Sequence, residues 1–247
     1  MSRPCKTLLA WTAAAMLAVS LGAPALAQET GVDLELVLLA DGSRSIDDAE
    51  IRFQREGYAK AIAHPQVVAA STGGYYRKIA VTYVEWGAAD SQVVIVPWTA
   101  IDGAKSAEAF AAALRGANVR ARGSNAIGTA IARGQELIET NAFDAARKVI
   151  DFSGDSAYSG GGISIAAARQ AALDAGITIN GLAVLCYSCS GPPISYDLTD
   201  AYKRLIVGGP GSFVLAADNE TGFTEAVRRK LVLEIAGRTP EDALARN

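Results

Sequence analysis

Hydrophobic residues follow two different spacings along the chain, and the two spacings alternate. Short, nearly unbroken apolar runs are typical of buried strands, whereas apolar residues three to four positions apart indicate amphipathic helices. Strands are predicted at 34–40, 76–86, 92–98, 148–153, 177–185 and 212–216. Helices are predicted at 47–63, 106–115, 127–139, 163–175, 198–207 and 223–236.

This order of elements predicts an α/β fold with one doubly wound, mostly parallel sheet and helices on both faces. The link at 87–91 is too short for a crossover, so one of its two flanking strands should be an antiparallel edge strand. The strands at 34–40 and 148–153 should be central neighbours where the strand order reverses. Ligands bind at such a point, just outside the carboxyl ends of the strands.

The first 27 residues have the pattern of a secretory signal peptide. Two basic residues precede an apolar stretch, and Ala25-Leu26-Ala27 offers a small-residue cleavage site. A membrane anchor is the alternative, although the stretch is short for one. We therefore expect cleavage after Ala27, a periplasmic or secreted protein, one domain at 28–237, and a frayed tail at 238–247. No later segment is apolar enough to span a bilayer.

The net charge and the cysteines indicate which partners and which covalent links to expect. The net charge is −3, and losing the signal peptide would remove two basic residues, which disfavours nucleic acid as a partner. Cys186 and Cys189 lie in a predicted loop after a strand. In an exported protein a disulfide between them is the favoured interpretation, with a redox-active pair or a zinc site as alternatives.

Polar residues follow the two central strands at their carboxyl ends. Asp41, Ser43 and Ser45 come directly after the first strand, and Asp155 comes after the strand at 148–153. Carboxylate and hydroxyl oxygens are hard ligands that suit Mg²⁺, Mn²⁺ or Ca²⁺. With few charged ligands, such an ion would keep a position open for a carboxylate from a partner.

The Asp41-Gly-Ser43-Arg-Ser45 motif resembles the Asp-x-Ser-x-Ser element of von Willebrand factor type A (vWA) domains, which form a metal-ion-dependent adhesion site. The resemblance covers about residues 32–237. It implies that Asp155 completes the site and that Asn125 stands where the family has threonine. Within the superfamily the chain is most similar to exported bacterial proteins of unknown function (DUF1194-like), through the motifs at 149–155, 179–182 and 207–213.

The resemblance implies a binding module that captures an Asp or Glu of an unknown partner protein through the bound cation. Tyr158 and the cysteine loop would surround the site. One alternative is that the same residues only cap structure, with Ser45 capping the next helix and Asp48 completing the capping box. Others are a metal-free vWA scaffold or a metal-dependent hydrolase.

No catalytic residue is assigned, and the chain is not expected to be an enzyme. His64 is the only histidine, it precedes a proline at a predicted helix end, and no second aspartate forms an Asp-x-Asp nucleophile pair. Arg228, Arg229 and Lys230 are expected on the solvated face of the last helix. Trp86 and Trp98 are expected to pack in the core and at the sheet edge.

Overall fold

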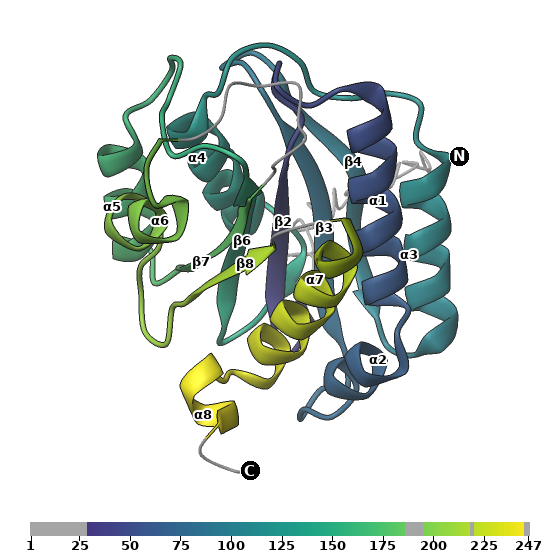
Figure 1. Cartoon of the computed structure of the whole chain (residues 1–247). Helices are drawn as coiled ribbons and strands as arrows, with labels where there is room; N and C mark the ends of the chain where they lie inside the picture. The colour runs from purple at the N-terminus through teal and green to yellow at the C-terminus, as the bar shows by residue number, and fades with distance from the viewer. Residues whose placement is uncertain (1–28, 186–194, 218–219, 245–247) are drawn as a thin grey trace, which may run out of the picture.

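A computed structural model describes residues 29–185, 195–217 and 220–244, and its centre is a six-stranded sheet in the order β4-β3-β2-β6-β7-β8 (Figure 1). Five neighbouring strands run parallel, and β4 pairs antiparallel with β3 at one edge. The predicted fold class and the predicted hairpin are therefore confirmed. The sheet consists of β2 (Glu35–Asp41), β3 (Ile79–Trp86), β4 (Gln92–Ile101), β6 (Lys148–Gly154), β7 (Thr178–Val184) and β8 (Val214–Ala217).

Strand β2 lies at the centre of the sheet and is buried along its whole length. It pairs with β3 on one side and with β6 on the other, as shown by the partners Asp41 with Trp86 and Leu39 with Phe152. The strands predicted to be central neighbours are thus adjacent. Their carboxyl ends share one edge of the sheet, where the connections leave in opposite directions.

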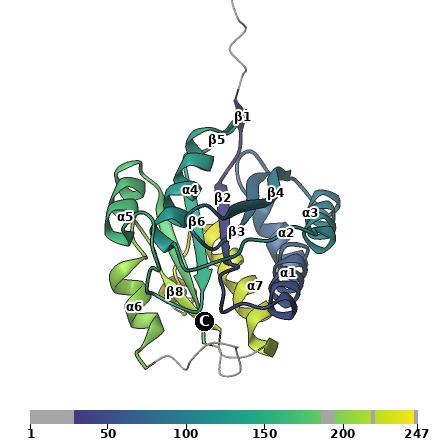
Figure 2. The same cartoon turned by 90° about the horizontal axis from the view of Figure 1, so that it is seen from above.

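Helices cover both faces of the sheet (Figure 2). Leu36 and Leu38 of β2 belong to the core beneath α1, α3 and α7, whereas Val37 and Leu39 belong to the core beneath α4, α5 and α6. Successive side chains of a strand point to opposite faces, so one apolar run supplies both cores. The covering helices are α1 (Asp48–Ile62), α3 (Ala104–Gly116), α4 (Ile127–Glu139), α5 (Ile165–Asp174), α6 (Leu198–Leu205) and α7 (Glu220–Ala236).

Three small elements were not predicted. Helix α2 (Pro65–Ser71) begins directly after α1, because His64 caps it and Pro65 occupies its first turn, where a missing N–H costs nothing. A two-stranded sheet joins β1 (Thr30–Gly31) to β5 (Phe143–Asp144). The tail, expected to be frayed, contains the short helix α8 (Pro240–Leu244).

The predicted cap of α1 is wrong in its position. Asp47 is the N-cap, and its carboxylate accepts hydrogen bonds from the amides of Ala49 and Glu50 at 2.7 and 2.9 Å. The Glu50 side chain accepts from the Asp47 amide and closes the capping box. Ser45 is therefore not the cap, and its hydroxyl is left for other contacts.

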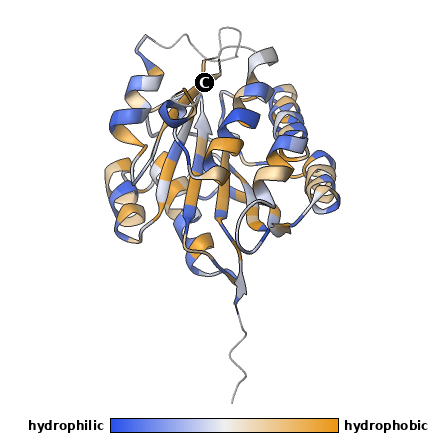
Figure 3. Cartoon of the chain, turned by 90° about the horizontal axis from the view of Figure 1, so that it is seen from below, coloured by the Kyte–Doolittle hydropathy of each residue, from blue (hydrophilic) through white to orange (hydrophobic). Residues whose placement is uncertain are grey.

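Lys230 is also wrongly predicted, because its side chain is fully buried beneath α7 and not solvated. Hydrophobic residues recur along the strands and on the inner sides of the helices (Figure 3), so an amine at this position is exceptional. No helix in the described part of the chain combines the length and apolar character needed to cross a bilayer.

Candidate metal site at the carboxyl edge of the sheet

The structure brings the predicted ligands to one edge of the sheet on three loops. Asp41 ends β2, and Ser43 and Ser45 lie between β2 and α1. Asn125 precedes α4, and Asp155 follows β6. The carboxyl ends of β2 and β6 are adjacent, so the topology itself gathers these loops.

The first loop is folded back so that its oxygens converge. The Ser43 amide donates a hydrogen bond to Oδ1 of Asp41 at 2.8 Å, and the hydroxyl oxygens of Ser43 and Ser45 lie 3.2 Å apart. Asp41 and Ser43 are buried, whereas Ser45 is partly exposed. A buried carboxylate and two hydroxyls therefore form a small oxygen cluster that opens toward solvent at Ser45.

Asp41 is held in an environment that disfavours a bare negative charge. Burial raises its pKa to about 8, and the nearby negative charge of Asp155 adds to the shift. Its second oxygen, Oδ2, is buried and accepts no hydrogen bond from any described residue. A Cβ added to Gly154 would lie only 2.9 Å from this oxygen, so the glycine leaves the space beside Asp41 clear.

These observations fit a cation. An unpartnered buried carboxylate oxygen next to a second carboxylate is costly, and a divalent ion would compensate both charges. The described residues contain no group of three or more His, Cys, Asp or Glu side chains arranged to bind a metal, so hydroxyl or amide oxygens would have to complete the set. Such a donor set suits hard cations.

Asn125 is fixed by its main chain. Its carbonyl oxygen accepts hydrogen bonds from the Gly160 amide and from the Ser159 hydroxyl, the latter at 3.2 Å. These bonds tie the loop before α4 to the loop that follows Asp155. The Asn125 side chain is partly buried and makes no hydrogen bond to the described residues, which leaves its amide oxygen available.

Arg120 holds the first loop from outside the oxygen cluster. Its guanidinium donates to the main-chain oxygen of Ile46 at 2.7 Å and to that of Gly42 at 3.4 Å, and it pairs with Asp48. The Arg44 amide donates to the Gly123 oxygen at 2.8 Å, which is a second link between the two loops. The loop geometry is therefore set by main-chain contacts as well as by the motif residues.

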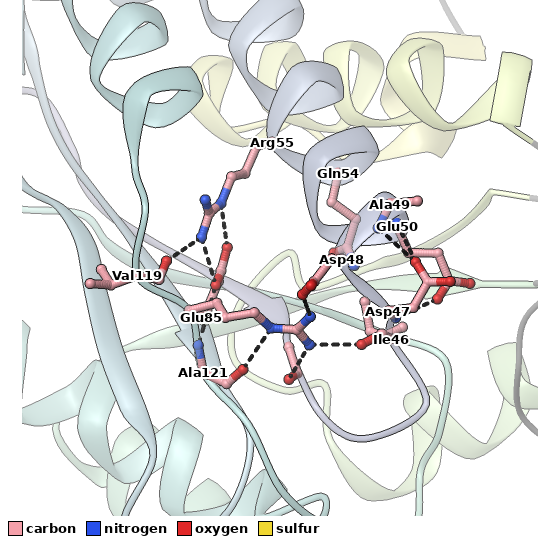
Figure 4. A network of polar contacts seen from close by, with 12 residues as sticks. Ile46, Asp47, Asp48, Ala49, Glu50, Gln54, Arg55, Glu85, Val119 and Ala121 are labelled. Atoms are coloured by element: carbon pink, nitrogen blue, oxygen red, sulfur yellow. Dashed lines mark hydrogen bonds and ion pairs between the residues drawn. The ribbon is translucent and has the colours of Figure 1, made fainter.

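A buried ion pair supports Arg120 in turn. Arg55 of α1 contacts both carboxylate oxygens of Glu85 on β3 at 2.7 and 3.0 Å, and it donates to the main-chain oxygen of Val119 at 2.6 Å (Figure 4). It also donates to the main-chain oxygen of Ala117 at 2.6 Å. Glu85 also accepts from the Ala121 amide at 3.4 Å. This network fixes the segment that carries Arg120.

Sequence reasoning missed several supporting residues. Gln54 donates to the main-chain oxygen of Asp41 at 3.1 Å, and the Trp86 indole donates to the Ser153 oxygen at 3.2 Å while it stacks on Phe152. Gln54 lies three residues after Ile51, on the buried face of α1, so its position offered a signal. Arg55 and Arg120 offered none, because long charged side chains are usually solvated.

The other residues singled out in the sequence lie in different parts of the molecule. Tyr158 is 67% exposed on the loop after Asp155 and packs edge to face with Tyr196, and its part in surrounding the site stays a prediction. Trp86 is buried in the core as predicted. His64 caps α2 and accepts from the Gln66 amide. The signal peptide and the disulfide of Cys186 and Cys189 lie outside the described residues.

Known structures with this fold include domains of larger proteins. The chain is similar to proximal thread matrix protein 1 from mussel byssus with a zinc-occupied MIDAS motif, at 14% identity and a TM-score of 0.59 over 84% of this chain and 49% of that one. It is similar to the pilus adhesin SpaC from Lactobacillus rhamnosus GG, at 11% identity and 0.57 over 83% and 31%. This chain therefore spans a third to a half of these proteins.

A third neighbour is matched over nearly its whole length. The vWF domain of the type V pili tip protein Mfa5 from Porphyromonas gingivalis is 9% identical, with a TM-score of 0.52 over 81% of this chain and 95% of that one. At such identities the likeness establishes a vWA-like fold and nothing finer. A comparison with curated proteins found no match.

A family model covers most of the chain. The model for a protein family of unknown function, DUF1194, matches residues 31–239. This range includes all six strands of the main sheet and all the candidate ligands. The chain belongs to the DUF1194 family and has a vWA-like fold.

Proposed function

We propose that this protein is an exported binding module that holds a divalent cation and uses it to capture a carboxylate on a partner protein. The ligands would be Asp41, Ser43, Ser45, Asn125 and Asp155. The observation that carries the proposal is the buried Oδ2 of Asp41, which receives no hydrogen bond of standard geometry from the described residues and belongs to a carboxyl group whose pKa the charge of Asp155 helps to raise. The structural neighbours, which include a pilus adhesin, a pilus tip protein and a matrix protein, favour binding over catalysis.

The donor set favours Mg²⁺, Mn²⁺ or Ca²⁺. All five proposed ligands offer oxygen, and only two of them carry a negative charge. A divalent ion so bound retains Lewis acidity toward one more anionic oxygen. Asn125 would contribute a neutral amide oxygen in place of the hydroxyl expected of a threonine. The zinc reported in the mussel protein makes zinc a necessary comparison in the experiment.

Calorimetry on the chelator-treated, mature protein tests the cation. We expect Mg²⁺ or Mn²⁺ to bind to the wild type and the heat to disappear in Asp155→Asn. Asp174→Asn is the matched control, because Asp174 is exposed at the end of α5, far from the three loops. Equal heats in all three proteins would place the cation outside the proposed site, and no heat in the wild type would favour a metal-free scaffold.

Partner capture and export need separate tests. Immobilised wild-type protein should retain a protein from envelope extracts with Mg²⁺ and release it with chelator, and Asp155→Asn should retain none. Retention by the variant would place the interaction elsewhere. N-terminal sequencing of the protein recovered from a periplasmic fraction should begin at Gln28 if the predicted signal peptide is removed.

A further inference from the structure

A second group of charged side chains lies inside the molecule, away from the candidate metal site. Lys230 and Glu234 of α7 and Asp151 of β6 are 0%, 2% and 1% exposed. They lie between the sheet and the last helix, on the face that carries the α1 and α7 core. Nothing in the proposed function uses them.

The three side chains are in direct contact. The amine nitrogen of Lys230 lies 2.6 Å from Oδ1 of Asp151 and also contacts the carboxyl group of Glu234. Asn180 of β7 donates to Oε1 of Glu234 at 2.9 Å. The ring of Phe213 has its centroid 5.8 Å from the amine, so the cluster is bordered by an aromatic side chain.

This cluster is poorly satisfied as a set of ions. Both carboxylate oxygens of Asp151 and Oε2 of Glu234 are buried and receive no hydrogen bond of standard geometry from the described residues, although Oδ1 of Asp151 lies in ion-pair contact with Lys230. One amine also faces two carboxyl groups, so full ionisation would leave an excess negative charge in a dry core. Burial raises the pKa of Glu234 to about 8, with the negative charge of Asp151 contributing, so Glu234 holds a proton at neutral pH.

We propose that Lys230 and Asp151 condense to an internal amide bond, with Glu234 transferring the protons. A nucleophile, an electrophile and a proton donor are then held together in a site that excludes water. The bond would replace two buried charges by one neutral amide. It would also join α7 covalently to β6, the strand that ends next to Asp155.

The reaction balances without an oxidant or cofactor. Lys230 first passes a proton to the carboxylate of Asp151, giving a neutral amine and a neutral acid. The amine nitrogen then attacks Cγ of Asp151, and an N–C bond forms. Glu234 gives its proton to the departing hydroxyl group and takes one from the nitrogen. The C–O bond breaks, and one water leaves.

The geometry favours this step. Near-attack arrangements hold the reacting atoms about 3–3.5 Å apart. The Cγ atom of Asp151 is bonded to Oδ1, the oxygen that lies 2.6 Å from the amine nitrogen of Lys230. The folded chain holds the two groups together permanently, which raises their effective concentration far above that of free amine and acid.

The proposal is tested directly by the intact mass of the wild-type protein, measured after folding and after reduction of any disulfide. We expect a mass lower than the sequence mass of the mature chain by one water. Trypsin should fail to cut after Lys230, and the digest should contain residues 149–169 joined to residues 230–238. A full mass with normal cleavage after Lys230 would overturn the proposal, as would a dehydrated peptide that remains linear.

Variants assign the roles. Asp151→Asn should give a cross-linked product of the same mass as the wild-type product, because the amide would release ammonia where the acid releases water. Glu234→Gln keeps the size of the side chain, and we expect it to stay uncross-linked. Lys230→Met is the control that cannot react. Because the wild-type mass alone decides whether the bond exists, poor folding of a variant leaves the test intact. Full cross-linking of Glu234→Gln would overturn the role of Glu234.

Discussion

Arg55 with Glu85 and Lys230 with Asp151 are two buried ion pairs on the same face of the sheet, but only the first is fully bonded. The guanidinium of Arg55 contacts both oxygens of Glu85 and two main-chain oxygens. Around Lys230, by contrast, three carboxyl oxygens, two of Asp151 and one of Glu234, lack a hydrogen bond from the described residues. The planar fork of arginine matches a carboxylate, whereas an amine meets it at one point.

This difference in hydrogen bonding indicates that Arg55 and Glu85 have a structural role, whereas Lys230 and Asp151 are placed to react. The Arg55 pair fixes the loop that carries Arg120, and Arg120 holds the loop of the candidate metal site. Because the guanidinium of Arg55 and the carboxylate of Glu85 are fully hydrogen-bonded, a reaction between buried groups would not be favoured there. In the unsatisfied cluster under α7, the amine of Lys230 stays in contact with the carboxyl group of Asp151. Condensation of these two groups would remove their buried charges.

Removing Glu85 from its ion pair with Arg55 should have the largest effect on stability. Glu85→Ala leaves the Arg55 charge buried without its partner, and we expect it to lower the free energy of unfolding by about 3–5 kcal/mol. Urea denaturation measures this loss. Glu56→Ala is the control, since Glu56 makes only half-exposed pairs with Lys60 and Arg115 and should cost at most about 1 kcal/mol. Similar losses in both variants would contradict the assignment.

In protein whose mass shows that Lys230 and Asp151 have not condensed, the unsatisfied cluster should affect the pH dependence of stability. The pKa of Glu234 rises from 4.5 to about 8 on folding, so between these values the folded state holds a proton that the unfolded state has released. The stabilisation is complete below about pH 4.5 and is lost as the pH rises toward 8. It amounts to a few kcal/mol, to order of magnitude. Unfolding free energies from pH 4.5 to 8.5 should fall less in Glu234→Gln, and parallel curves would contradict this.

Loosening the loop that Arg55 supports should weaken cation binding without removing a ligand. Arg120→Ala loses the bonds to Ile46 and Gly42, and residues that orient ligands commonly contribute about 10–100-fold in metal affinity. Calorimetric titration with Mn²⁺ measures the change. Arg122→Ala is the matched control, because that side chain is exposed and forms no ion pair in the described structure. Equal affinities would show that the loop is preorganised without Arg120.

The smallest expected change in stability comes from Asp47, the exposed N-cap of α1. Asp47→Ala removes the cap of α1 and should cost about 1 kcal/mol of stability. Ser45→Ala should leave thermal stability in chelator almost unchanged, because Ser45 is not the cap. A larger loss in Ser45→Ala than in Asp47→Ala, measured by thermal unfolding, would restore the capping assignment made from the sequence.

Local sequence patterns were enough to predict the sheet and to bring the candidate ligands to one edge of it. Apolar runs such as 34–40 must be buried on both faces, and their order with the intervening helices permits few topologies. The adjacency of β2 and β6, and hence the approach of Asp41 to Asp155, follows from that order. Helix α4 was predicted with the bounds that the structure has, because both its spacing and its length are clear.

Tertiary structure alone decided which charged residues lie inside. Lys230 follows two arginines on a helix and has the local pattern of a solvated face, yet β6 places Asp151 opposite it. Arg55 is buried and Arg120 is partly buried for the same reason, since their partners come from segments about 30 to 75 residues away. The free energy of a buried charge depends on partners that meet only in the folded chain, and no local sequence pattern records them.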